Sequence, residues 1–87
     1  MGSFRLVFKQ SVAKDLRRLP NEDVARILKR IESLAEDPLP QGSEKLSGQE
    51  RYRVRQGVYR IIYEIRNEEL VVLIVKVGHR REIYKNS

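Results

Sequence analysis

The sequence contains no cysteine, a single histidine and no long hydrophobic run. Without cysteine there is neither a disulfide framework nor a zinc site built on thiolates, and one histidine argues against a metal site made of several histidines. No apolar stretch approaches the roughly 18 residues that span a bilayer, and the first residues lack a secretory hydrophobic segment. These absences predict a cytoplasmic protein that uses no metal and no cofactor and makes no membrane contact.

The chain is short, and its length limits the kind of site it can hold. At 87 residues it is expected to form a single domain, 1–87, and such a domain buries only about 60% of its unfolded surface. A hydrophobic content of 40% and a charged content of 34% are typical of a folded globular protein. We therefore expect a functional site in a shallow surface groove.

Carboxylates are scarce in the C-terminal part of the chain. Residues 1–50 carry a net charge of +1, whereas residues 51–87 carry +5. A basic segment of this kind favours a polyanionic partner, with RNA or DNA first. An acidic protein, an anionic membrane or a merely solubilising surface would fit the same charge.

The spacing of apolar residues predicts a strand and two helices in the N-terminal half. Residues 3–9 alternate as a half-buried strand does, and 12–19 fit a short helix capped by Ser11. Residues 22–36 fit a longer helix capped by Asn21, with apolar residues every three or four positions. That stripe consists of Val24, Ile27, Leu28, Ile31, Leu34 and Ala35.

Strands are predicted for the C-terminal half, after a loop over 37–50 that is rich in Pro, Gly and Ser. They span 51–56, 58–66 and 70–77, with turns at Gly57 and 67–69, and Gly78 ends the last of them. The result is an α+β fold of order β-α-α-β-β-β, in which an N-terminal strand and a helical hairpin precede a three-stranded antiparallel meander. The helices cover one face of the sheet, and the other face stays open for a ligand.

The ribbon RYRVRQGVYRIIYEIR, residues 51–66, concentrates arginine on one face of the predicted sheet. Side chains alternate along a strand, so Arg51, Arg53 and Arg55 share a face that Arg60 joins from the next strand. Glu64 lies on the same face, where it either pairs with Arg60 or acts as a base. His79 and Arg80, placed just past the last strand, are expected to complete a basic cluster. Crowded like charges repel one another, so an anion is expected among them.

Three segments together resemble the RelE/ParE superfamily of toxins from type II toxin–antitoxin modules. They are AKDLRRLP, EKLSGQERYRVRQGVYRIIYEI and VVLIVKVGHRREIY, and they extend over nearly the whole chain. The RelE branch, which the sequence resembles most, implies a ribosome-dependent endoribonuclease that cuts mRNA in the 30S A site. It implies metal-free cleavage by attack of the ribose 2′-hydroxyl on the adjacent phosphorus. The implied partner is an acidic antitoxin, and operator DNA is bound only through the toxin–antitoxin complex.

The resemblance also implies roles for individual residues. Arg53 and Arg55 match two basic positions of the family, commonly lysines, and Arg60 and Arg80 match two arginines. Tyr84 matches a C-terminal tyrosine on which a base stacks. The implied catalytic set, with His79 added as the side chain whose ordinary pKa suits proton transfer, is Arg53, Arg55, Arg60, Arg80, Tyr84 and His79. The implied RNA-binding set is Arg51, Arg53, Arg55, Arg81 and Tyr84.

Each assignment has a simpler alternative that the sequence leaves open. Arg53 and Arg55 fit a solvated strand surface, His79 an ordinary surface histidine, and Tyr84 a side chain packed on the sheet edge. Arginine hardly loses its proton, so Arg53 and Arg55 suit charge stabilisation better than the role of a base. For the whole protein, the alternatives are a ParE-like inhibitor of DNA gyrase and an inactive module that only binds an antitoxin.

Overall fold

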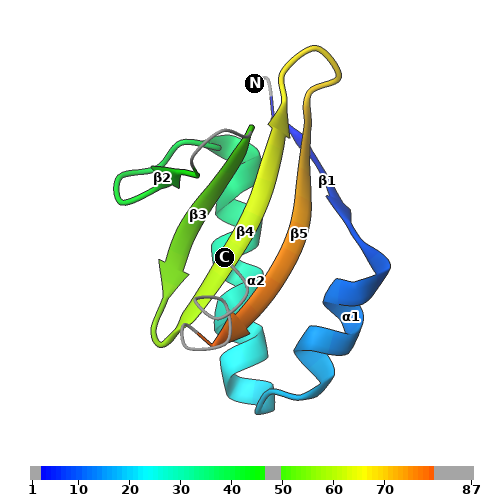
Figure 1. Ribbon diagram of the computed structural model, residues 1–87, viewed down its shortest axis with the longest axis vertical. Helices are drawn as coiled ribbons and strands as arrows, with labels where there is room; N and C mark the ends of the chain where they lie inside the picture. Colours follow the sequence, from blue (N-terminus) through cyan, green and yellow to red (C-terminus); the bar gives the residue numbers. More distant parts are fainter. Residues whose placement is uncertain (1–2, 47–49, 80–87) are drawn as a thin grey trace.

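The computed structural model describes residues 3–46 and 50–79, which form two helices and a five-stranded sheet (Figure 1). In chain order the elements are β1 (Arg5–Phe8), α1 (Gln10–Arg17), α2 (Asn21–Glu36), β2 (Glu44–Lys45), β3 (Arg51–Gln56), β4 (Tyr59–Arg66) and β5 (Val71–His79). The predicted α+β class and the predicted order of strand, helical hairpin and strands are confirmed.

The sheet is mixed, with strand order β1-β5-β4-β3-β2. Strands β3, β4 and β5 form the predicted antiparallel meander, and β1 joins its far edge parallel to β5. The short strand β2, which pairs Glu44 with Arg53 and Lys45 with Tyr52, was not predicted. Two residues are too few to show the alternation that identifies a strand, so the prediction of a loop over 37–50 was wrong at this point.

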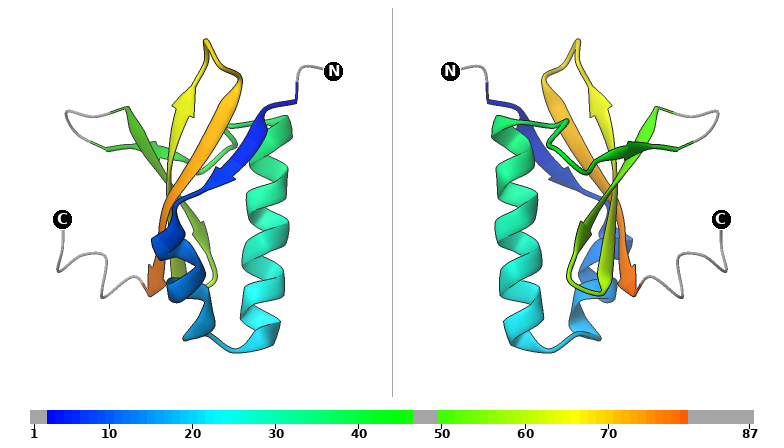
Figure 2. Two further views of the ribbon diagram at one scale, coloured as in Figure 1. Left: turned by 90° about the vertical axis from the view of Figure 1, so that its right-hand side faces the viewer. Right: turned by 90° about the vertical axis from the view of Figure 1, so that its left-hand side faces the viewer.

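Helix α2 lies across one face of the sheet, and no helix of residues 3–46 and 50–79 covers the opposite face (Figure 2). The predicted apolar stripe provides this contact, because Ile27, Ile31 and Leu34 are fully buried. They belong to the same core cluster as Ile61 and Tyr63 of β4. We call the sheet surface turned away from α2 the open face. Burial of alternate residues along β4 therefore decides which side chains reach the open face.

Helix α1 lies beside the C-terminal end of β5 (Figure 1). The backbone N–H of Val77 donates a hydrogen bond of 3.2 Å to Oδ2 of Asp15, which ties the helix to the strand. The predicted caps were wrong: Lys9 and Pro20 occupy the two N-cap positions, and neither makes a side-chain capping bond. Ser11 and Asn21 lie inside the first turns, because both helices begin earlier than the apolar spacing suggested.

Tyr63 connects the centre of β4 to the segment that follows α2. Its hydroxyl donates a hydrogen bond of 2.7 Å to the carbonyl oxygen of Pro38, and its ring stacks on Tyr52 with centroids 5.9 Å apart. Desolvation raises the pKa of Tyr63 to about 12, so the hydroxyl remains a donor at neutral pH. The contact holds β3 and β4 against the helical layer.

The turn between β3 and β4 depends on Gly57, whose φ of +60° is in the region that favours glycine. The Gly57→Ala variant is expected to lower the free energy of unfolding by about 1–2 kcal/mol, the usual cost of placing a side chain in the left-handed region. The position is open, because apart from the two chain neighbours no described residue has a heavy atom within 4 Å of an added Cβ, so the cost is conformational only. Urea denaturation measures it. A loss below about 0.5 kcal/mol would show that the turn does not need a glycine.

Candidate functional site

Three arginines, Arg53, Arg55 and Arg60, meet on the open face near the β3–β4 turn, and we call them the arginine cluster. Arg55 of β3 lies directly opposite Arg60 of β4 in the strand register. Arg53 is two residues before Arg55 and therefore projects from the same face. The predicted alternation thus brings these side chains together, as Val54 and Tyr59 between them turn toward α2.

Arg60 differs from the other arginines in its burial. It is 3% exposed, and within residues 3–46 and 50–79 it is the only charged residue that is buried. A small hollow of about 30 Å³ lies against it, lined by Arg55, Gly57, Tyr59 and Arg60. That volume has room for one water molecule or one ligand oxygen. A cation in such surroundings interacts more strongly with an anion that reaches it than an exposed cation does.

Glu44 of β2 brings a carboxylate to the arginine cluster. It lies opposite Arg53 in the register, and its Oε2 accepts a hydrogen bond from Nη2 of Arg53. This bond and the charge of Arg53 hold the pKa of Glu44 below its usual range, and the charges of Arg55 and Arg60 act in the same direction. The carboxylate therefore interacts electrostatically with all three guanidinium groups. Sequence reading missed Glu44 because the strand that orients it was not recognised.

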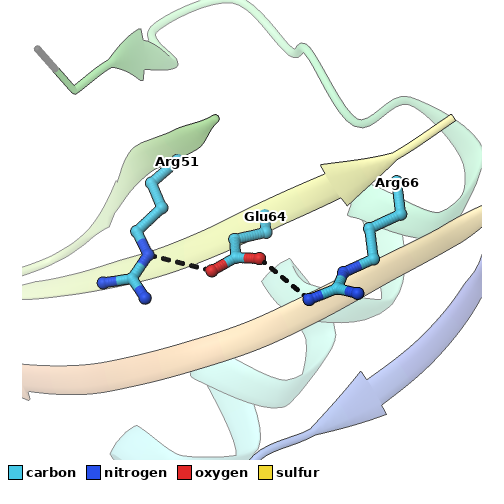
Figure 3. Close-up of polar contacts among 3 residues, drawn as sticks. All are labelled: Arg51, Glu64 and Arg66. Carbon is cyan, nitrogen blue, oxygen red and sulfur yellow. Dashed lines mark hydrogen bonds and ion pairs between the residues drawn. The ribbon is translucent and has the colours of Figure 1, made fainter. Parts of the chain in front are cut away.

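At the other end of the open face one carboxylate lies between two arginines (Figure 3). Glu64 of β4 accepts hydrogen bonds from Nε of Arg51 at 2.9 Å and from Nη2 of Arg66 at 3.3 Å. Burial acts to raise the pKa of Glu64, but the hydrogen bonds and charges of the two arginines outweigh it, so the pKa is lowered. The ion-pair interpretation of Glu64 is confirmed, although its partners are Arg51 and Arg66 and not Arg60.

The lowered pKa of Glu64 predicts a loss of stability in acid. A carboxyl group whose pKa is lower in the folded state stabilises that state above its ordinary pKa of 4.5, and the contribution disappears as the pH falls through the folded value. We expect Glu64→Gln to lower the free energy of unfolding by about 1 kcal/mol at pH 7 and by less at pH 3. Denaturant titrations at both pH values measure this, with Glu32→Gln on α2 as the control. An equal loss at both pH values would contradict the role of the ion pairs.

His79 does not lie in the arginine cluster. Strand β5 continues through Gly78 to His79, so the prediction that Gly78 ends the strand was wrong. His79 pairs with Tyr59, and the two rings meet edge to face with centroids 6.1 Å apart. Tyr59 donates a 2.7 Å hydrogen bond to Asp23 of α2 and so belongs to the helix side of the sheet. Gly78 lies opposite Arg60 in the register. His79 follows it in β5 and therefore points to the other face of the sheet.

Several predicted site residues lie outside the described part of the chain. These are Arg80, Arg81 and Tyr84. Within residues 3–46 and 50–79 there is no group of three or more His, Asp or Glu side chains arranged to hold a metal ion. Neither helix of this part is long and apolar enough to cross a membrane.

Comparison with known proteins places the chain in a family. The sequence model described as "ParE toxin of type II toxin-antitoxin system, parDE" matches residues 6–84. RelE1 of Methanocaldococcus jannaschii is 31% identical over 87 residues, which cover 95% of this chain and 97% of that protein. The chain belongs to the RelE/ParE toxin superfamily.

Two further relatives place this RelE/ParE protein near RelE toxins. The toxin RelG of Mycobacterium tuberculosis is 32% identical over 82 residues, covering 90% of this chain and 92% of its own. The crystal structure of the RelE–RelB complex of Pyrococcus horikoshii OT3 matches with a TM-score of 0.80 and 31% identity, covering 90% of this chain and 96% of that one. The match therefore extends over almost the whole chain in each case.

Proposed function

We propose that this RelE-like toxin is an endoribonuclease that cuts mRNA in the ribosomal A site. The observation that carries the proposal is the arginine cluster: two cations on β3 and one on β4 share the open face, and Arg60 is buried. Guanidinium groups bind phosphate oxygens through paired hydrogen bonds and stay charged at any physiological pH. A cluster of this kind suits a single phosphodiester that gains negative charge during a reaction.

The proposed reaction needs no metal ion. The ribose 2′-oxygen forms a bond to the adjacent phosphorus as its proton is removed, and the bond from phosphorus to the 5′-oxygen breaks. The products are a 2′,3′-cyclic phosphate and a 5′-hydroxyl group, which takes up one proton. The non-bridging oxygens carry the extra charge in between, and donors preorganised around that charge provide the largest part of the rate enhancement. We assign this role chiefly to Arg60, with Arg53 and Arg55 in support.

Proton transfer is not assigned to Glu64 or His79. Glu64 is held between Arg51 and Arg66, and His79 contacts Tyr59 on the helix side of the sheet. For the residues outside the described part, the family resemblance supports Arg80 at the leaving oxygen, Arg81 on the RNA backbone and Tyr84 under a base. A tyrosine ring contributes about 1–3 kcal/mol when a base stacks on it.

A cognate antitoxin is part of the proposal. The relative from Pyrococcus horikoshii OT3 is a complex of RelE with RelB. The net charge of +6 suits an acidic partner segment. Co-expression with the product of a neighbouring reading frame is expected to restore growth that the toxin alone arrests.

Primer extension on mRNA from cells that express the protein tests the nuclease. We expect new 5′ ends within translated regions, absent when ribosomes are kept off the message. If growth stops and no new 5′ ends appear, the nuclease proposal fails.

A ParE-like inhibitor of DNA gyrase is the second candidate, and the matched family model favours it by its description. The relatives with the RelE name and the arginine cluster favour the nuclease. A supercoiling assay with purified gyrase separates the two. Inhibition of supercoiling by the protein, without cleavage of message, would establish the second candidate.

A further inference from the structure

Glu44 and Arg53 form an ion pair of unequal partners. The side chain of Arg53 is 18% exposed, whereas that of Glu44 is 56% exposed. The guanidinium is therefore held by the sheet surface, and the carboxylate approaches it from the solvent side. A ligand that binds Nη2 of Arg53 from the solvent has to take the place of this carboxylate.

A carboxylate and a phosphate bind arginine in the same way. Each offers two oxygens in a plane that matches the paired N–H groups of a guanidinium. Glu44 lies opposite Arg53 in the strand register and accepts a hydrogen bond from its Nη2, so its carboxylate occupies a position at Arg53 that a phosphate oxygen of the proposed substrate could take. In the free protein it also reduces the mutual repulsion of three neighbouring cations.

We propose that Glu44 is an internal anion that occupies the phosphate-binding position at Arg53 and is displaced when a phosphodiester binds. This inference rests on the proposed function, because it takes an RNA phosphate as the ligand of the arginine cluster. It makes Glu44 a residue that lowers the affinity of the toxin for any phosphodiester offered alone. A substrate presented with further contacts overcomes this competition, so the carboxylate favours message held in place over free RNA.

The test uses a 2′-O-methyl RNA tetranucleotide, which binds as RNA does but lacks the attacking hydroxyl. The ¹⁵N-labelled full-length protein is titrated with this probe, and the dissociation constant is taken from the NMR signals of the arginine Nε–H groups. Glu44→Gln is expected to bind the probe about fivefold more tightly than the wild type, near the upper end of what one exposed ion pair contributes. Backbone spectra show that each variant is folded.

Two controls distinguish competition for Arg53 from the general effect of removing one negative charge. Glu32→Gln removes the same charge from the exposed surface of α2, across the sheet from the arginine cluster, and is expected to change the affinity less than about twofold because salt screens distant charges. In the Arg53→Ala background, Glu44→Gln is expected to have a smaller effect than in the wild type, because the hydrogen-bonded pair with Arg53 is already removed.

Two results would overturn the proposal. If Glu44→Gln binds no more tightly than Glu32→Gln, the carboxylate does not compete with the probe. If it binds more weakly, Glu44 positions Arg53 for the ligand and does not exclude it. The measurement involves no cleavage and no ribosome, so it can succeed or fail separately from the nuclease proposal.

Discussion

Replacing Arg60 with alanine is expected to lower the rate of mRNA cleavage by about 10²–10³-fold, the usual cost of removing one preorganised donor to a developing anion. The reason lies in the surroundings of this side chain, which is 3% exposed and adjoins a hollow with room for one ligand oxygen. Water screens a buried charge poorly, so its interaction with a phosphorane is stronger than that of Arg55 on the exposed rim. Cleavage of defined message by purified ribosomes with each variant measures the effect.

Further variants distinguish the loss of the paired donors of Arg60 from the loss of its charge and from a loss of folding. Arg60→Lys keeps the positive charge but loses the paired donors, so we expect it to recover only a small part of the rate. Arg17→Ala removes an exposed arginine of α1 and is expected to cleave at the wild-type rate. Thermal unfolding is recorded for each protein, because Arg60 is buried. A folded Arg60→Ala protein that cleaves within about tenfold of the wild type would contradict the assignment.

The fold was predictable wherever one face of an element is buried. The stripe on α2 and the alternation along β4 both follow from burial against a single core, so Ile27, Ile31 and Ile61 were placed correctly from spacing alone. The ends of elements were harder to predict. Gly78 lies within β5 because strand pairing with Arg60 outweighs the low strand preference of glycine.

The candidate site was predictable to the extent that it depends on the same alternation. Arg53, Arg55 and Arg60 reach the open face because their neighbours Val54 and Ile61 are core residues. Glu44 and His79 were missed or misplaced for a single reason. One lies in a strand of two residues and the other at a strand end, where the face depends on pairing that a single sequence does not show.

The two ends of the open face explain why so many arginines occupy one ribbon. Toward the end of β4, Glu64 pairs with its neighbours Arg51 and Arg66, and these pairs stabilise the sheet. Toward the β3–β4 turn, the carboxylate beside the arginine cluster is that of Glu44, and all three guanidinium groups lower its pKa. Arginine therefore has a structural role at one end, where two cations share one carboxylate, and leaves the larger positive excess at the other, where three cations share one. That excess is what a phosphodiester would neutralise.

Replacing Ile61 with alanine is expected to lower the free energy of unfolding by about 2–5 kcal/mol, as deletion of a buried isoleucine side chain usually does. Ile61 is fully buried and belongs to the core cluster that includes Ile27 and Ile31 of α2. A small domain has a total stability of about 5–15 kcal/mol, so this one change removes a large part of it. Urea denaturation of the purified variant, made in an Arg60→Gln background to avoid growth arrest, measures the loss.

Ile62→Ala in the same background is the matched comparison. Ile62 follows Ile61 in β4 but lies on the open face and is partly exposed, so we expect it to cost about 1 kcal/mol or less. The two variants remove the same atoms from adjacent positions, and only the face of the sheet differs. If Ile62→Ala costs more than Ile61→Ala, the two faces of β4 are exchanged. A one-residue shift of that kind would place Arg60 beneath α2 and Tyr59 on the open face, and the arginine cluster would no longer exist.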